Sequence, residues 1–194
     1  LHLLSRIRDA GIRRVVLGTS FKAEVFEEYF GDGSELGLEL SYVVETEPLG
    51  TGGGIRNVLS ALKADTVLVF NGDVLGGSDI RAVVNTHREK DADVTMHLVR
   101  VPDPRAFGCV PTDATGRVTA FLEKTQDPPT DQINAGCYVF KRSVIEEIPA
   151  GRPVSVEREV FPALLNGGSR LYGHVDYGYW RDMGTPEDFV AGSS

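Results

Sequence analysis

The sequence has few cysteines, no long hydrophobic run and no cluster of basic residues, and each shortage excludes a class of protein. Its two cysteines, Cys109 and Cys137, form no CxxC pair, which predicts reduced core thiols rather than a disulfide framework or a zinc site. No apolar run approaches the roughly 20 residues that a membrane helix needs, and the start lacks the pattern of a signal peptide. A net charge of −8 without a basic run argues against nucleic acid as a partner. We therefore expect a cytoplasmic globular protein without a membrane or nucleic-acid partner.

The common motifs of nucleophilic and cofactor-dependent catalysis are also missing. There is no GxSxG and no Cys–His pairing, and the absence of GxGxxG and GxxxxGK[ST] disfavours a Rossmann dinucleotide site and a P-loop. If the ligand is a nucleotide, an acidic protein needs local help to hold the phosphates, and a divalent cation between carboxylates and phosphates is the usual answer. The histidines lack metal-ligand spacing and receive no functional role: His2, His87, His97 and His174.

Helical and extended patterns alternate regularly along the 194 residues, which suffice for one domain with a sizeable core. The segment 66–70, TVLVF, is nearly all apolar, which is typical of a parallel strand covered on both faces. The alternation predicts an α/β fold with a doubly wound, mostly parallel sheet, followed by a mixed β insertion. Helices are expected near 1–10, 23–30, 55–62, 79–90, 143–148 and 157–165, and extended segments near 14–17, 38–44, 66–70, 94–101, 107–111, 117–123, 135–140, 171–175 and 179–180.

A glycine-rich segment, EPLGTGGG at 47–54, separates an expected strand from an expected helix. Four glycines in five positions let a backbone approach a flat or anionic ligand, and the helix N-terminus behind them offers N–H groups. A flexible turn explains the same residues equally well from local features.

Asp73 follows the buried strand at 66–70, and doubly wound sheets bind ligands at the carboxyl ends of their strands. A carboxylate there is well placed to hold Mg²⁺ against a phosphate. The alternative is that Asp73 caps the following turn.

Three later segments also carry polar side chains suited to a sugar phosphate. Glu123 and Lys124 can bind sugar hydroxyls and a phosphate, although a solvated ion pair is the commoner arrangement. Asn134 can donate to and accept from a sugar, or simply begin a strand. Asp182 offers a second carboxylate two residues after Trp180; the alternative is that Trp180 is a core residue and Asp182 satisfies loop amides.

Taken in order, these segments resemble the sugar-phosphate nucleotidyltransferases, and among them the mannose-1-phosphate guanylyltransferases. The resemblance runs from the first helix to the last and predicts a nucleotidyltransferase domain over 1–191, with 192–194 a linker or a cut end. The blocks that carry it are EPLGTGGGI, VFNGDVL, FGCV, FLEKT, NAGCYVF, VSVEREVFPALL and YWRDMGTPEDF.

The resemblance implies an activity: a nucleotide-sugar, GDP-mannose above all, is formed from a nucleoside triphosphate and a sugar 1-phosphate, with Mg²⁺ and release of pyrophosphate. GTP and mannose 1-phosphate are the favoured substrates, and homo-oligomerisation is left open. Asp73, Asp182 and Lys124 are the implied catalytic residues, with the two carboxylates holding the metal. The other implied contacts are Gly50, Thr51, Gly52 and Gly53 with the nucleotide, and Gly108, Glu123, Lys124 and Asn134 with the sugar phosphate.

The chain departs from the family at its start. A first strand and a loop of the type GGxGTRLxPLT do not precede the helix that begins near Leu1. We therefore expect a fold that lacks its first strand, a chain that is part of a longer protein, and little turnover by these residues alone.

Two other functions fit parts of the sequence. The first is a catalytically inactive, nucleotide-sugar-binding regulatory subunit, which would keep the sugar contacts without the loop. The second is a metal-dependent glycosyltransferase, which is disfavoured because Asn71-Gly72-Asp73 is not a DxD pair.

Overall fold

The computed structural model describes residues 2–19 and 23–183, so the expected domain end at residue 191 lies outside the described residues. The chain divides into two compact units. Unit 1 contains the described residues up to Asp65 together with Arg142–Val160, and unit 2 contains Thr66–Lys141 and the described residues from Phe161 onward. No helix in the described ranges is long and apolar enough to cross a bilayer.

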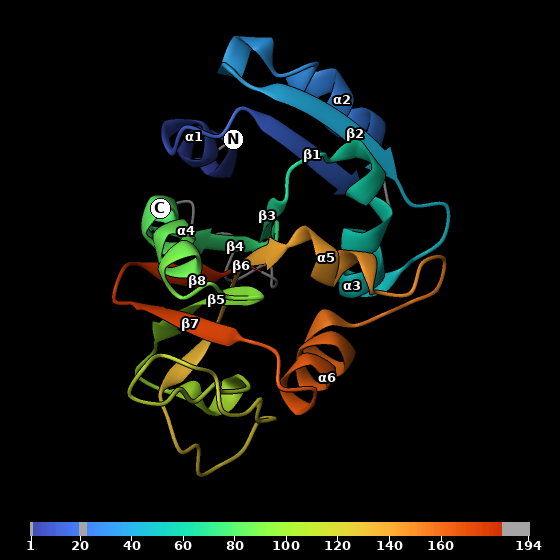
Figure 1. Ribbon diagram of the computed structural model, residues 1–194. Helices are drawn as coiled ribbons and strands as arrows, with labels where there is room; N and C mark the ends of the chain where they lie inside the picture. Colours follow the sequence, from blue (N-terminus) through green and yellow to red (C-terminus); the bar gives the residue numbers. More distant parts are fainter. Residues whose placement is uncertain (1, 20–22, 184–194) are drawn as a thin grey trace. The chain divides into compact units, whose positions relative to one another are not determined.

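Unit 1 is built around a pair of parallel strands, β1 and β2, with Arg14 opposite Glu39 (Figure 1). Its apolar cluster consists of Leu4, Leu38 and Leu40, with Val15 and other half-buried side chains against it. The elements of unit 1 are α1 His2–Asp9, β1 Arg14–Thr19, α2 Ala23–Phe30, β2 Glu39–Val44, α3 Gly50–Asn57, α5 Arg142–Glu146 and the π-helical turn η4 Val156–Val160, with 3₁₀ turns at Ser34–Leu36 and Leu59–Ala61.

Unit 2 contains a four-stranded sheet in the order β3-β6-β5-β7 and a short two-stranded ladder, β4-β8. Strand β6 lies antiparallel to both β3 and β5, whereas β5 and β7 are parallel. The elements of unit 2 are β3 Thr66–Phe70, β4 Val74–Gly76, α4 Ile80–Glu89, β5 Val94–Arg100, a 3₁₀ turn Pro104–Ala106, β6 Gln132–Lys141, α6 Phe161–Asn166, β7 Leu171–Asp176 and β8 Trp180–Asp182.

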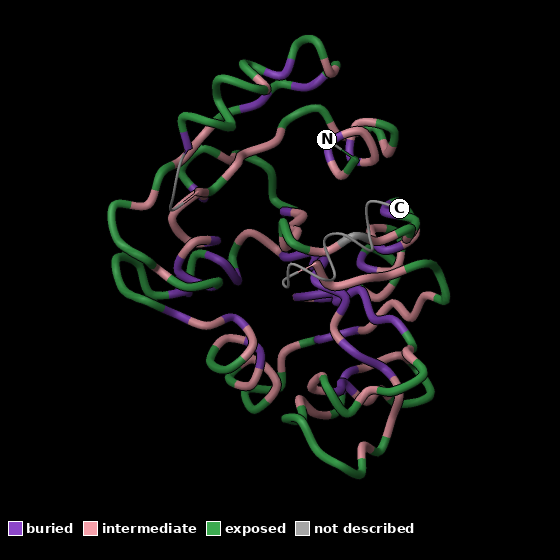
Figure 2. The backbone as a smooth tube through the Cα atoms, turned by 180° about the vertical axis from the view of Figure 1, so that it is seen from behind, coloured by how far each residue is buried: buried purple, intermediate pink, exposed green. Residues whose placement is uncertain are grey.

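The core of unit 2 lies along β5 and β6, most of whose residues are buried (Figure 2). Helix α4 begins where the Asp79 carboxylate accepts hydrogen bonds from the first-turn N–H groups. Ile80, Val83 and His87, spaced for one helical face, are buried. The His87 ring is satisfied by a 2.9 Å hydrogen bond between Nδ1 and Thr95 Oγ1.

Most predicted elements are confirmed to within a few residues, including the helix at 23–30 and the strand at 66–70. The predicted turn at 50–54 is wrong, because α3 already begins at Gly50. The expected mixture of strand directions is confirmed, but β3 is antiparallel to its partner, and only Val67 in it is fully buried. The prediction of a parallel strand covered on both faces is therefore wrong, because an apolar run fixes neither the burial of each residue nor the direction of the neighbouring strand.

Burial lowers the pKa of His87 from its ordinary 6.5 because the charged imidazolium loses its hydration. Lys141 acts in the same direction, Asp91 and Asp93 oppose it, and Arg88 adds a smaller lowering. The neutral ring is therefore favoured by folding, so its contribution to stability is present above the unfolded pKa of 6.5. It is lost as the pH falls toward the lower folded pKa.

We expect the free energy of unfolding to fall between about pH 8 and about pH 5.5 more steeply in the native protein than in His87→Asn. Asparagine keeps a hydrogen-bonding atom near the Nδ1 position but cannot be protonated in this range. Urea titrations followed by the fluorescence of Trp180, the only tryptophan, provide the measurement. His2→Asn, which changes an exposed histidine on α1, is the control. Equal slopes for His87→Asn and the native protein would contradict the prediction.

Candidate functional site

In unit 1, the glycine-rich start of α3 lies directly against the segment 152–156, about a hundred residues later in the chain. The N–H groups of Gly52 and Gly53 donate to the Val154 carbonyl at 2.8 and 3.3 Å, and Val154 N–H donates to Leu49 O at 2.9 Å. The N–H groups of Gly52 and Gly53 are therefore bonded within unit 1.

This contact explains why glycine stands at three of these positions. A Cβ on Gly50 would lie 2.7 Å from Val154 O, and the residue has a φ of +68°. A Cβ on Gly53 would lie 2.8 Å from Arg152 O, and one on Gly52 3.0 Å from Val154 Cγ1. The glycines thus permit a close approach of backbone to backbone, and the helix forms despite their low helix propensity.

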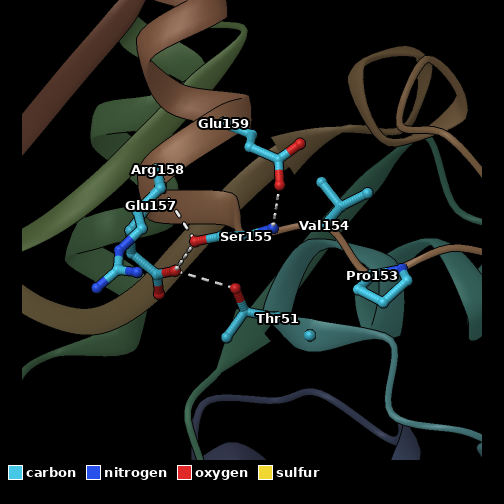
Figure 3. A pocket seen from close by; sticks show the side chains of 8 residues that line it. Thr51, Pro153, Val154, Ser155, Glu157, Arg158 and Glu159 are labelled. Carbon is cyan, nitrogen blue, oxygen red and sulfur yellow. Dashed lines mark hydrogen bonds between the residues drawn. The ribbon is translucent and has the colours of Figure 1, made fainter.

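The hydroxyl of Thr51 extends the same contact to the side chains. Thr51 Oγ1 donates to Glu157 Oε2 at 2.9 Å and accepts from Val156 N–H at 2.9 Å. Ser155 Oγ also donates to Glu157 Oε2, at 3.3 Å, so both hydroxyls meet on one carboxylate oxygen (Figure 3). An open pocket of about 590 Å³ is found here, lined by Gly50, Thr51, Pro153, Val154, Ser155, Glu157, Arg158 and Glu159.

In unit 2, the two predicted metal ligands are brought to neighbouring positions by the β4-β8 ladder. Asp182 is opposite Val74, the residue after Asp73, and Met183 N–H donates to the Asp73 carbonyl at 2.8 Å. Asp73 is exposed and Asp182 is half-buried. Residues separated by more than a hundred positions in the sequence therefore come to adjacent backbone positions at one end of a short ladder.

Three of the residues predicted to contact the sugar, Gly108, Glu123 and Asn134, are aligned across three neighbouring extended segments. Cys109 forms antiparallel bridges with both Leu122 and Ile133. In antiparallel pairing the preceding residue, Gly108, then lies beside Glu123 on one side and Asn134 on the other. A Cβ on Gly108 would lie only 2.7 Å from Leu122 O and 4.0 Å from Glu123 Cα, so glycine allows this approach.

The side chain of Asn134 is held by its own strand. Its Oδ1 accepts from Gly136 N–H at 2.8 Å, and its Nδ2 donates to the buried Tyr138 hydroxyl at 2.6 Å. This fixes the orientation of the amide. Trp180 Nε1 donates to Ala135 O at 3.0 Å, which ties the start of β8 to the same part of β6.

Trp180 is half-buried and packs edge-on against Phe107, with ring centroids 5.5 Å apart, so it lies against the core cluster rather than within it. Glu123 and Lys124 are both exposed. The ion pairs of the described residues do not include one between them. Both side chains are thus accessible to a ligand.

The family model described as nucleotidyl transferase matches residues 1–194. The chain belongs to this nucleotidyl transferase family. It is 68% identical over 194 residues, all of this chain, to the mannose-1-phosphate guanylyltransferase of Mycobacterium tuberculosis, of which it covers 54%. It is 38% identical over 195 residues, 99% of this chain, to the mannose-1-phosphate guanylyltransferase catalytic subunit beta of Drosophila pseudoobscura pseudoobscura, of which it covers 52%.

Solved structures agree with this assignment. HddC from Yersinia pseudotuberculosis superposes with a TM-score of 0.85 at 27% identity, over 98% of this chain and 81% of that one. Its complex with GMP-PN gives a TM-score of 0.84 over the same shares of the two chains. The nucleotidyl transferase therefore has the Rossmann-like α/β fold with a mixed sheet that the sequence predicts. The chain spans about half the length of the curated relatives it matches.

Asp73 and Asp182 would be the residues to hold a magnesium ion, because both offer carboxylate oxygens from adjacent ladder positions. Mg²⁺ prefers oxygen ligands, keeps several waters and is commonly bound by one or two carboxylates plus substrate phosphates. Asp73 and Asp182 supply that number of carboxylates at adjacent positions. Across the described ranges, no group of three or more His, Cys, Asp or Glu side chains could form a self-sufficient metal site. The donor set is thus one that a phosphate ligand would complete.

Sequence reasoning assigned no role to Ser155 or Glu157, although the block VSVEREVFPALL contains both. Only the tertiary structure brings them to Thr51. A local signal would have been hard to find, because a lone Ser or Glu before a helix is also an ordinary capping residue.

Proposed function

We propose that the gene product containing this chain forms GDP-mannose from GTP and mannose 1-phosphate with release of pyrophosphate, and that it acts in the cytoplasm. The observation that carries this proposal is the 68% identity to the mannose-1-phosphate guanylyltransferase of M. tuberculosis across all 194 residues. The regulatory alternative has less support, because the relatives are named as transferases and one of them as a catalytic subunit.

In this proposal the sugar 1-phosphate attacks the α-phosphorus in line and pyrophosphate leaves, so no enzyme nucleophile is required. Asp73 and Asp182 hold Mg²⁺, which supplies charge neutralisation at the α-phosphate. Lys124 binds the phosphate of the sugar. The remaining proposed contacts are Gly108, Glu123 and Asn134 with the sugar, and Gly50, Thr51, Gly52 and Gly53 with the nucleotide.

The geometry of unit 2 supports these roles. Gly108 lies between Glu123 and Asn134 in three neighbouring extended segments, which places a carboxylate and a fixed amide on either side of the glycine. Such a pair can accept and donate hydrogen bonds to vicinal sugar hydroxyls. The exposed ammonium of Lys124 follows directly in the chain.

We expect pyrophosphate release with GTP, mannose 1-phosphate and Mg²⁺, and much slower release when GTP is replaced by ATP, CTP, UTP or dTTP. The assay uses the intact gene product, and the nucleotide-sugar is identified by mass spectrometry. A matched reaction with glucose 1-phosphate reports the preference for the sugar. Binding of GDP-mannose without any turnover would favour the regulatory alternative. Equal rates with all five triphosphates would contradict the assignment of GTP.

A further inference from the structure

We propose that Glu157 is a positioning residue for the nucleotide, acting through Thr51 on the glycine-rich first turn of α3. The inference rests on the proposed function, in which the backbone around Gly50 and Thr51 contacts the nucleotide. Glu157 lies outside that turn by more than a hundred residues and has no role in the reaction as proposed above.

The connection between Glu157 and the turn is a set of short hydrogen bonds. One oxygen of the carboxylate, Oε2, accepts from the hydroxyls of Thr51 and Ser155 at 2.9 and 3.3 Å. The Thr51 hydroxyl uses its single proton for Glu157 and an oxygen lone pair for Val156 N–H. Hydrogen bonds to an ionised carboxylate are about twice as strong as neutral ones, so this charge fixes the direction of the Thr51 hydroxyl.

The carboxylate is itself held in a defined segment. Ser155, which donates to Glu157, is itself bound through its backbone: its N–H donates to Glu159 Oε1 at 3.2 Å (Figure 3). The Ser155 hydroxyl also accepts from Arg158 N–H at 3.1 Å at the beginning of η4. The turn η4 is π-helical, a conformation that is frequent at functional sites. Glu157 therefore lies on a segment with little freedom to shift.

A shift of the segment 152–157 is expected to move the start of α3, because the two backbones are in direct contact at Gly50–Gly53. Gly52 N–H is 2.8 Å from Val154 O, and a single methyl group on Gly50 or Gly53 would overlap the backbone of residues 152–154. Close-packed contacts of this kind transmit small movements rather than absorbing them. Loss of the Glu157 carboxylate is thus expected to alter the position of the turn that meets the nucleotide.

The competing explanation is that Glu157 only stabilises unit 1. The two explanations differ in their kinetic signature. A purely structural loss lowers the amount of active protein and leaves both KM values unchanged, whereas a displaced nucleotide turn raises the KM for GTP selectively.

In the intact gene product, Glu157→Ala is expected to raise the KM for GTP about tenfold, with kcat and the KM for mannose 1-phosphate changed by less than about twofold. Glu157→Gln keeps an acceptor oxygen in the same place and should restore most of the affinity. Glu146→Ala, on α5 of the same unit, removes an exposed carboxylate paired with Arg142 and is the matched control. Thermal melting of each variant reports stability separately.

A double-mutant cycle tests the route through Thr51. Because Thr51→Val removes the same hydrogen bond, adding Glu157→Ala to it should raise the KM for GTP by less than about twofold more. Additive effects, an equal rise in both KM values, or an unchanged KM for GTP would each overturn the proposal. Failure of the proposed function is distinguishable, because it would be seen as absent GDP-mannose formation by the native protein.

Discussion

Replacing Asp73 by asparagine is expected to lower kcat/KM about a hundredfold or more and to abolish the Mg²⁺-dependent part of GDP-mannose binding. The substitution removes the charge that would neutralise the metal while keeping the size of the side chain. Asp73 contributes its backbone carbonyl, not its carboxylate, to the hydrogen bond from Met183 N–H. The β4-β8 ladder should therefore survive, and the melting temperature should remain close to that of the native protein.

This variant also separates the metal role of Asp73 from its alternative as a turn cap. Asparagine caps turns about as well as aspartate, so a capping role predicts little change in either activity or binding. Asp127→Asn, in an exposed loop, is the control for the loss of one negative charge. Calorimetry of GDP-mannose binding with and without Mg²⁺ gives the measurement, and an unchanged metal dependence in Asp73→Asn would return Asp73 to the capping role.

Phe161→Ala is expected to reduce the free energy of unfolding by about 3–5 kcal/mol. Phe161 is fully buried in unit 2, where its ring stacks on Phe121 and Phe140 with centroids 5.6 and 6.1 Å apart. It also meets the Tyr138 ring edge-on at 5.0 Å. Truncation leaves a cavity between three aromatic side chains that no single neighbour can fill.

Phe161→Ala should also disturb the proposed sugar contacts. Phe121, which stacks on Phe161, precedes Glu123 and Lys124 by only two and three residues. We expect the KM for mannose 1-phosphate to rise in whatever fraction of the variant remains folded. Phe26→Ala, which truncates an exposed phenylalanine on α2, is the control and should cost no more than about 0.5 kcal/mol. Urea titrations provide the measurement, and a similar loss in the two variants would contradict the central role of the Phe161 ring.

The predictions that held are those that depend on local periodicity and on turn chemistry. The helix expected at 23–30 and the apolar run at 66–70 correspond to α2 and β3, and the helix expected near 79–90 corresponds to α4. Between the extended segments expected at 107–111 and 117–123, Asp113 N–H donates to Arg117 O at 2.9 Å and closes a turn. The segments on either side of it, by contrast, form isolated bridges rather than continuous strands.

The predictions that failed depend on contacts between distant segments. Local propensity predicts a turn at 50–54, whereas packing against Val154 makes those residues the start of α3. The direction of β3 relative to β6 is likewise invisible in an apolar run. In each case the deciding interaction is made by a residue far away in the chain.

The sequence by itself determined the α/β class, the positions of most elements and, through the ordered blocks, the nucleotidyl transferase family. Each of these is encoded in residues close together in the chain: the class and the elements in the spacing of apolar residues, and the family in short sequence motifs. Only the tertiary structure decided which residues meet. It brings Asp182 beside Asp73 across a short ladder, Gly108 between Glu123 and Asn134, and Glu157 onto Thr51. The physical reason is that strand pairing and close backbone packing join positions that no local pattern relates.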